Sequence, residues 1–367
     1  EPDRCSDVGP SCGTATMTRS TTLKSADDIV EAGLVELARL EEIEKVTRQY
    51  ALAITPDVAK LIDPADPDDP IARQFVPSAR ELETTPEERA DPIGDHAHTP
   101  VRGLVHRYPD RVLLKAVHVC PVYCRFCFRR ERVGPEKGAP LSKAELEAAL
   151  AYIAGRPEIF EVILTGGDPM VLSPARAGEI TRRLEAIDHV KVIRWHSRVP
   201  VAAPERVTPE FAEAIRGRTK SVFVAIHANH AREFTPEARV AIRRLAQAGI
   251  SLVSQSVLLR GVNDSFEALA DLMRAFLSVG IKPYYLHQLD AAPGTSHFRV
   301  PVEEGQALVR RIRDELSGLA TPHFVADIPG GVSKAVMNLP DIERRGDDFR
   351  LRGRDGEHYS LPGAQKN

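Results

Sequence analysis

The sequence predicts an α/β fold in which parallel strands form a partial (βα)6 barrel similar to a TIM barrel. Between residues 101 and 300, six short β-branched runs alternate with amphipathic segments. Repeated strand–helix units of this kind imply a parallel sheet covered by helices, with right-handed crossovers. A doubly wound open sheet is the alternative, because near-continuous apolar strands suit either architecture.

The expected strands are the apolar runs at residues 111–119, 161–167, 190–197, 221–229, 250–258 and 282–290. The segments between them carry apolar residues at helical spacing. These helices are expected at residues 142–155, 174–187, 209–217, 236–249 and 265–280.

Three further regions flank the predicted barrel of residues 101–300. Residues 1–16 are expected to form a disordered tail, with Met17 as a candidate natural start. Residues 17–100 form an N-terminal region that is helical at first and, from Asp57 onward, rich in Pro and Asp, which break regular elements. Residues 301–367 form a C-terminal segment that carries a candidate cofactor-binding lysine.

Composition excludes several classes of function. The net charge is −3 and the pI about 6.5, so there is no basic field for nucleic acid. No apolar run is long enough to span a membrane, and the N-terminus has no secretory signal, so a cytoplasmic protein is expected. Five cysteines in 367 residues do not make a disulfide framework. Clustered thiols then point to metal or redox chemistry.

Unusual residues follow the predicted strands. In a parallel barrel the carboxyl ends of the strands form the active face, so these residues are expected to line one pocket. They are Cys120, the stretch Gly166, Gly167 and Asp168, the stretch His196 to Arg198, His227 with Asn229 and His230, Gln255 and Asp290.

Three cysteines lie on one loop after the first predicted strand. Cys120, Cys124 and Cys127 have the spacing Cys-x3-Cys-x2-Cys. Structural zinc sites use four ligands, commonly in two pairs, whereas an iron–sulfur cluster held by three cysteines keeps one iron open for a small molecule. The alternative is a zinc site completed by His118 or a distant histidine.

Lys334 follows a Gly-Gly turn in the weakly polar stretch "FVADIPGGVSKAVMNLP". A desolvated lysine has a depressed pKa and can form a Schiff base. Arg107, Arg111 and Gln255 would supply an anion site for a phosphate. On the residues alone, a solvated loop lysine and surface arginines are the simpler interpretation.

The cysteine loop together with "TGGDP" at residues 165–169 resembles the radical S-adenosylmethionine enzymes. From about residue 95 to about residue 361, the chain resembles the lysine 2,3-aminomutase family. The shared stretches occur in the family's order: "GLVHRYPDRVLL", "CPVYCRFCFRR", "ILTGGDP", "SRVPV", "HANH", "QSVLLRGVND", "PYYLHQLD", "GTSHFRVP" and "PGGVSK".

The resemblance implies an isomerase that interconverts L-lysine and β-lysine by a radical 1,2-amino shift. It implies a [4Fe-4S] cluster, S-adenosylmethionine and pyridoxal 5′-phosphate as cofactors, with a flavodoxin- or ferredoxin-like electron donor. Cys120, Cys124 and Cys127 would ligate the cluster, and Gly166, Gly167 and Asp168 would contact S-adenosylmethionine. Lys334 would hold pyridoxal phosphate, whose phosphate Arg107, Arg111 and Gln255 would contact. Arg129 would bind the substrate carboxylate, and Asp290 and Asp327 its distal ammonium.

The chain departs from the family at one point. Some members carry a structural zinc bound partly by a cysteine after "GVND", but Ser265 stands there and no cysteine follows Cys127. The zinc is therefore expected to be absent.

Several alternatives stay open. The substrate could be arginine or another cationic amino acid, and β-lysine could serve elongation factor P modification. The enzyme could lack pyridoxal phosphate, or the protein could be an electron-transfer or zinc-binding scaffold. Asp290 could cap a helix, and Asp327 could be a turn residue. The helical N-terminal region is a candidate interface of a homo-oligomer, although such helices commonly just cover a core.

Overall fold

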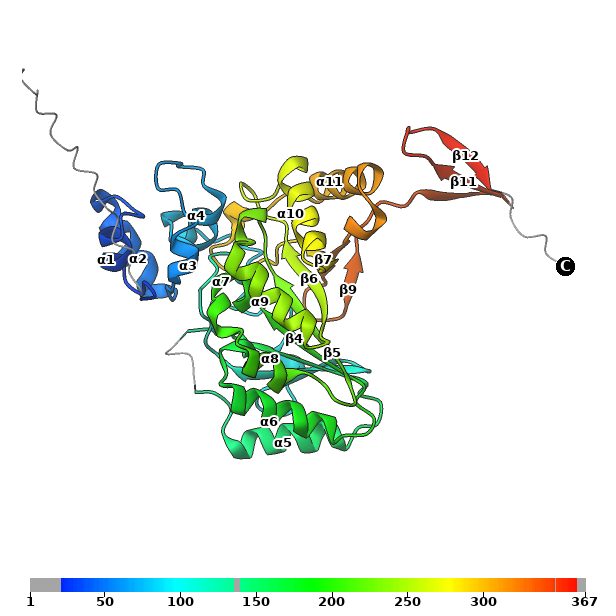
Figure 1. The fold of residues 1–367 in the computed structure, drawn as a ribbon. Helices are drawn as coiled ribbons and strands as arrows, with labels where there is room; N and C mark the ends of the chain where they lie inside the picture. Colours follow the sequence, from blue (N-terminus) through cyan, green and yellow to red (C-terminus); the bar gives the residue numbers. More distant parts are fainter. Residues whose placement is uncertain (1–20, 135–138, 347, 362–367) are drawn as a thin grey trace, which may run out of the picture.

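A nine-stranded sheet, whose strand order follows the chain order, forms the centre of the computed structural model (Figure 1). The structure describes residues 21–134, 139–346 and 348–361. The predicted disordered tail of residues 1–16, with Cys5 and Cys12, lies outside them. The strands are β1 Leu104–Tyr108, β2 Arg111–Val117, β3 Glu161–Gly166, β4 Val192–Ser197, β5 Ser221–His227, β6 Ser251–Val257, β7 Lys282–His287, β8 His323–Asp327 and β9 Lys334–Val336.

The six predicted strands occur as β2 to β7, and all of them pair in parallel. A seventh parallel strand, β8, pairs with β7, and the antiparallel strands β1 and β9 form the two edges. A doubly wound sheet reverses its strand order, and this sheet does not. The prediction of a partial barrel is therefore confirmed.

Helices between the strands cover the outer face of the sheet. They are α5 Lys143–Ala154, α6 Pro174–Glu185, α7 Val199–Ala202, α8 Pro209–Ile215, α9 Pro236–Gln247, α10 Phe266–Ser278 and α11 Val302–Glu315. Five of them begin where a Ser or Thr side chain accepts a backbone N–H of the first turn, namely at Ser142, Ser173, Thr208, Thr235 and Ser265. Such caps satisfy donors that have no partner within the helix.

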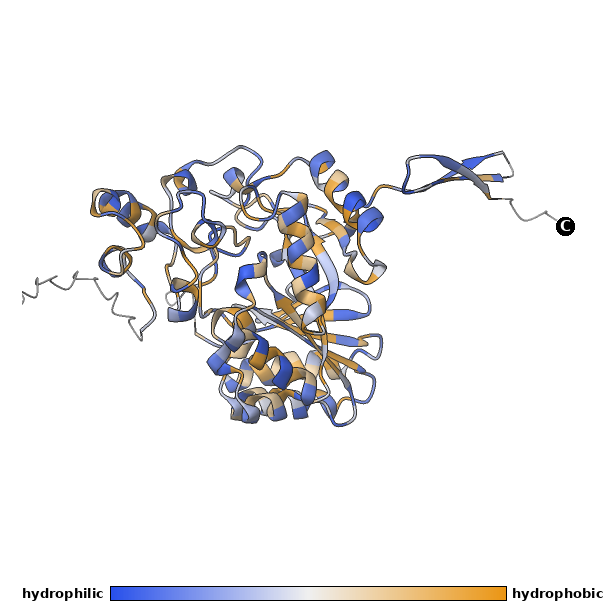
Figure 2. Ribbon diagram, turned by 45° about the horizontal axis from the view of Figure 1, so that its top comes forward, coloured by the Kyte–Doolittle hydropathy of each residue, from blue (hydrophilic) through white to orange (hydrophobic). Residues whose placement is uncertain are grey.

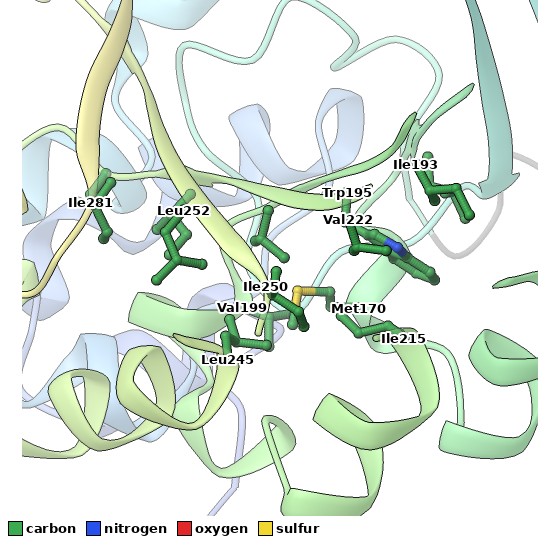
Figure 3. Packing of buried hydrophobic residues seen from close by; sticks show 14 of the residues in the cluster. Met170, Ile193, Trp195, Val199, Ile215, Val222, Leu245, Ile250, Leu252 and Ile281 are labelled. Atoms are coloured by element: carbon green, nitrogen blue, oxygen red, sulfur yellow. The ribbon is translucent and has the colours of Figure 1, made fainter. Parts of the chain in front are cut away.

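The hydrophobic core lies between the sheet and these helices. Alternate strand residues such as Ile193, Trp195 and Val222 point outward and pack against Met170 and helical residues such as Ile215 (Figure 3). Hydrophobic residues accordingly concentrate along the strands and on the sheet-facing sides of the helices (Figure 2). The intervening residues of each strand point to the concave face, because side chains alternate along a strand.

The N-terminal helices form a separate cluster beside the barrel (Figure 1). They are α1 Ala26–Glu31, α2 Leu40–Gln49, α3 Pro56–Ala59 and α4 Pro70–Phe75. Their buried residues, among them Ile29, Ile43 and Phe75, pack together with Val122 of the cysteine loop. Short 3-10 turns complete the fold at Leu37–Arg39, Ala79–Leu82, His96–His98, Pro169–Val171, Pro204–Arg206, Ala231–Glu233, Ser296–Phe298 and Gly318–Ala320.

A three-stranded antiparallel sheet extends away from the barrel near the C-terminal end (Figure 1). It consists of β10 Ile342–Arg345, β11 Asp348–Arg352 and β12 His358–Leu361. The sequence analysis predicted neither this sheet nor the pair β8–β9. Among the helices of the described residues, none has the length and apolar character needed to cross a bilayer.

Candidate active site

The three predicted cluster cysteines lie on the loop that leaves the carboxyl end of β2. All three cysteines are half-buried. Their thiols are close enough that Cys124 and Cys127 raise the pKa of Cys120, and Cys124 raises that of Cys127. Burial raises the pKa of all three thiols, that of Cys127 to about 11. Desolvated thiols of this kind stay neutral unless a nearby cation stabilises the thiolate.

The three cysteines are candidate ligands of a metal centre. Within the described part of the chain, no three His, Cys, Asp or Glu side chains converge closely enough to hold one metal ion. A four-iron cluster instead takes one thiolate per iron, so its ligating sulfurs stand apart.

Glu81 of the N-terminal region holds the cysteine loop in place. Its buried carboxylate accepts from Nε and Nη2 of Arg125, at 3.0 and 2.6 Å, and pairs also with Arg130. The Arg130 guanidinium stacks on the Tyr50 ring, with 3.5 Å from Cζ to the ring centroid. Both arginines lie within three residues of a cluster cysteine, so this network fixes the shape of the loop.

Gly166 and Gly167 let the end of β3 approach the start of the cysteine loop. A Cβ on Gly167 would lie 2.2 Å from the carbonyl oxygen of Val119, and Gly166 has a φ of 116°. The next residue, Asp168, donates its backbone N–H to the same carbonyl at 2.9 Å. Its buried carboxylate accepts from Ser197 Oγ at 2.8 Å and Arg198 N at 2.7 Å. The stretch predicted to contact S-adenosylmethionine therefore lies beside the cysteine loop. The Asp168 side chain is used to bind the turn after β4.

Arg198 touches the cluster loop directly. Its Nη1 lies 3.1 Å from Cys124 Sγ, and its Nη2 donates to Glu233 and Gln74, both at 2.6 Å. This guanidinium partly offsets the effect of burial on the pKa of the Cys124 thiol. Arg198 follows a predicted strand, but the sequence alone indicated no role for it.

Lys334, the predicted cofactor lysine, opens β9 directly opposite Asp327 of β8. Its Nζ forms an ion pair with Asp327 Oδ2, and His287 Nδ1 lies 3.8 Å from the same oxygen. Burial, and then the neighbouring Asp327, raise the pKa of Asp290 to about 7. The structure therefore brings the predicted lysine and both predicted ammonium-binding carboxylates together on the concave face.

Arg107 and Arg129 meet at a carboxylate that the sequence analysis missed. Asp95 Oδ1 accepts from Arg107 Nη2 at 2.9 Å, while Asp95 Oδ2 lies 3.2 Å from Arg129 Nη2 and 3.6 Å from Lys115 Nζ. Although burial opposes it, these three cations lower the pKa of Asp95 to about 2. Arg107 Nη1 also reaches Asp327 at 3.5 Å, which joins β1 to β8 across the open side of the sheet.

Arg111 and Gln255 lie farther from this centre. Arg111 begins β2, at the end of the strand away from the cysteine loop; its Nη1 donates to Asp110 at 2.8 Å. Gln255 Nε2 lies 3.2 Å from Nε2 of His287. His287 follows Tyr285 by two residues on β7. The centroid of the Tyr285 ring lies 6.0 Å from Lys334 Nζ. The charge of Arg111 lowers the pKa of Tyr285, against the larger effect of burial. Tyr285 is therefore close to Lys334 and within electrostatic reach of Arg111.

Buried histidines complete the concave face. Burial lowers the pKa of His196, His227 and His287 well below the ordinary value, so all three are neutral. The Nε2 atoms of His196 and His227 are buried without a hydrogen-bond partner, as is Nε of Arg107. Buried polar atoms normally have a hydrogen-bond partner, so these three nitrogens are available to a group bound at the concave face.

The sequence offered unequal signals for these residues. Arg198 stands at a strand end, as the predicted site residues do, so position alone could have assigned it a role. Asp95 and Glu81 lie in the Pro- and Asp-rich stretch, where no periodicity distinguishes one acid from its neighbours.

Comparison with known proteins identifies the family of this chain. Residues 114–273 match the radical SAM superfamily. L-lysine 2,3-aminomutase of Clostridium subterminale is 38% identical over 326 residues, covering 88% of this chain and 78% of that protein. The enzyme of the same name from Acetoanaerobium sticklandii is 40% identical and covers 81% and 71%. Glutamate 2,3-aminomutase of Clostridioides difficile is 34% identical and covers 84% and 72%. At these identities and coverages, the chain belongs to the L-lysine 2,3-aminomutase family of the radical SAM superfamily.

Proposed function

We propose that this enzyme interconverts L-lysine and β-lysine by moving the amino group between C2 and C3 of lysine. The observation that carries the substrate assignment is the pair of buried carboxylates, Asp290 and Asp327, beside Lys334 on the concave face. Relatives named L-lysine 2,3-aminomutase support the reaction type. The relative named glutamate 2,3-aminomutase makes the choice of amino acid a question for the site itself.

Membership of the radical SAM superfamily implies a [4Fe-4S] cluster and S-adenosylmethionine. Bound together, these two cofactors supply the radical that starts the reaction. Cys120, Cys124 and Cys127 would ligate the cluster, and Arg198 would stay in contact with one of the ligating sulfurs. The glycines at the end of β3 would leave backbone space beside the cluster for S-adenosylmethionine.

Pyridoxal phosphate is the third cofactor in this proposal. When bound, it supplies a conjugated carbonyl carbon to which the migrating nitrogen attaches. Lys334 would hold it covalently in the resting enzyme. Arg107 would bind its phosphate, and the unpaired buried Nε of Arg107 is a donor suited to that anion. Arg111, which begins β2 and pairs with Asp110, and Gln255, which lies beside His287, would be the further phosphate contacts that the family resemblance implies.

The charges of the site favour a cationic substrate. In the free chain the Lys334 ammonium balances Asp327. Asp290 lies beside Asp327, so the two acids outnumber this one lysine whenever Asp290 is ionised. A second ammonium, such as that at the far end of lysine, would restore the balance. The side-chain carboxylate of glutamate would add a third negative charge and be repelled.

At the other end of the substrate, Arg129 would bind the α-carboxylate. It follows the last cluster cysteine by two residues, so it would hold the substrate next to the source of the radical. The neutral histidines of the concave face offer no mobile cationic proton there. The chain's own residues therefore bind both ends of lysine and exclude water, while the cofactors carry the bond-breaking chemistry.

The test is an anaerobic assay of the reconstituted protein. The protein is loaded with iron, sulfide and pyridoxal phosphate, then supplied with S-adenosylmethionine, a reductant and either L-lysine, L-arginine or L-glutamate. Mass spectrometry of derivatised products should show a β-isomer of lysine alone. A β-isomer of arginine would move the assignment to a longer cation. A β-isomer of glutamate, or 5′-deoxyadenosine without any isomer, would refute the substrate assignment.

A further inference from the structure

One carboxylate, Asp95, joins three cations that come from different parts of the fold. Arg107 belongs to β1, Lys115 to β2 and Arg129 to the cysteine loop. Asp95 uses Oδ1 for Arg107 and Oδ2 for the other two, and all four side chains are largely buried. The planar guanidinium groups of the two arginines bind this carboxylate in a fixed orientation.

The loop that carries Asp95 is itself held rigid. Asp91 accepts the backbone N–H groups of Asp95 and His96, each at 2.9 Å. Thr99 Oγ1 donates to the carbonyl oxygen of Asp95 at 2.7 Å. The carboxylate of Asp95 is therefore fixed from its own backbone and is not a mobile surface group.

The same loop packs against the turn that precedes Lys334. A Cβ on Gly94 would lie 2.5 Å from the carbonyl oxygen of Gly330, and the His98 ring nitrogen Nε2 lies 3.3 Å from that oxygen. The loop of residues 91–99 thus touches both the arginine pair and the turn of the cofactor lysine.

We propose that Asp95 is a positioning residue, which sets Arg107 for the cofactor phosphate and Arg129 for the substrate carboxylate. This inference rests on the proposed function. Asp95 occupies Nη2 of Arg107 and leaves the buried Nε of that guanidinium without a partner. It thereby holds both guanidinium groups in place before either anion arrives, so neither binding step has to order an arginine.

A second account would make Asp95 only a counter-charge for the three cations. The two accounts predict opposite signs. If Asp95 were only a counter-charge, its removal would make the concave face more positive and tighten the binding of anions. If Asp95 positions the arginines, its removal loosens them and weakens the binding of both anions.

The test compares Asp95→Asn, Asp95→Glu and the wild-type enzyme. Asp341→Asn, which removes a carboxylate paired with Arg313 at 2.6 Å near the C-terminal sheet, serves as the control. Pyridoxal phosphate affinity is measured by titrating the visible absorbance band of the cofactor bound to Lys334. The KM and kcat for lysine are measured at saturating cofactor.

Asp95→Asn should weaken pyridoxal phosphate binding and raise the KM for lysine, each by roughly tenfold. This is the size expected for the loss of one hydrogen bond to a charged group. The change in kcat should be smaller. Asp95→Glu keeps the charge but moves it by one methylene, so it should fall between Asn and wild type. Unchanged or tighter cofactor binding in Asp95→Asn would overturn the inference. If that variant fails to fold by circular dichroism, Asp95→Glu decides, because wild-type affinity there would refute positioning.

The outcome also separates this inference from the proposed function. If the wild-type protein binds pyridoxal phosphate but makes no β-lysine, the substrate assignment falls, and the cofactor affinities of the variants still decide the role of Asp95. If the wild-type protein gives no visible band with pyridoxal phosphate, both conclusions are overturned.

Discussion

Replacing Asp290 with Asn should change how the stability of the free protein depends on pH. Burial and the neighbouring Asp327 raise the pKa of Asp290 to about 7, whereas an unfolded aspartate has a pKa near 3.8. Between these two values the folded protein binds more protons at this residue than the unfolded chain does. Stability from Asp290 is therefore present below pH 4 and is lost as the pH rises through 7.

The size of the effect follows from the same two values. A difference of roughly three pKa units corresponds to about 4 kcal/mol, and about 3 kcal/mol of it is lost between pH 5 and pH 8. Asn does not ionise, so the Asp290→Asn variant should not suffer this loss. Relative to wild type, the variant should gain about 3 kcal/mol in free energy of unfolding between pH 5 and pH 8.

The assay is urea unfolding at both pH values, with protein purified without added cofactors. Asp341→Asn removes an aspartate from a surface ion pair and should follow the wild-type pH dependence. If Asp290→Asn differs from wild type by the same free energy at pH 5 and pH 8, then Asp290 is not protonated in the folded protein. The proposal that Asp290 and Asp327 bind the distal ammonium of the substrate would then lose its support.

Three further substitutions test other parts of the site. Lys334→Ala should abolish β-lysine formation and the visible band of bound pyridoxal phosphate, while cleavage of S-adenosylmethionine continues; β-lysine from this variant would disprove the role of the lysine. Glu81→Gln removes the carboxylate that pairs with two buried guanidinium groups, so it should lower the free energy of unfolding by about 3–5 kcal/mol in urea unfolding. The control Glu41→Gln, at an exposed ion pair, should lower it little. Gly167→Ala places a Cβ against the Val119 carbonyl oxygen and should lower the iron bound after reconstitution, and normal iron content would show that the loop can shift to make room.

The barrel could be predicted from sequence because its signals are local. Each predicted strand from β2 to β7 is an apolar run of one element, and each of the five predicted helices between them begins at a Ser or Thr cap. The cysteine spacing is likewise contained within eight residues. Such features need no knowledge of which segments meet in space.

The remaining parts depend on contacts between distant segments. Lys334 reaches Asp327 through the antiparallel pair β8–β9, whose three-residue strand β9 has no apolar alternation to identify it. Asp95 becomes important only because its loop folds back onto β1 and the cysteine loop. Arg107 was expected before the first strand but lies within β1, in a hairpin whose register shifts between Val105 and Tyr108.

The open side of the sheet has a mechanical consequence. β1 and β9 stand at opposite edges of the sheet, yet Arg107 of β1 reaches Asp327 of β8 across the gap between them. Every other pair of neighbouring strands in this sheet is joined by backbone hydrogen bonds. β1 and β9 are instead connected through side chains and through the close packing of the turns at Gly94 and Gly330. Side-chain contacts can break and re-form without disturbing a backbone ladder, so this seam can open while the neighbouring strand pairs stay intact. The two edges of the sheet are therefore coupled by the charges of Arg107 and Asp327, so a change in either charge would be felt at both edges.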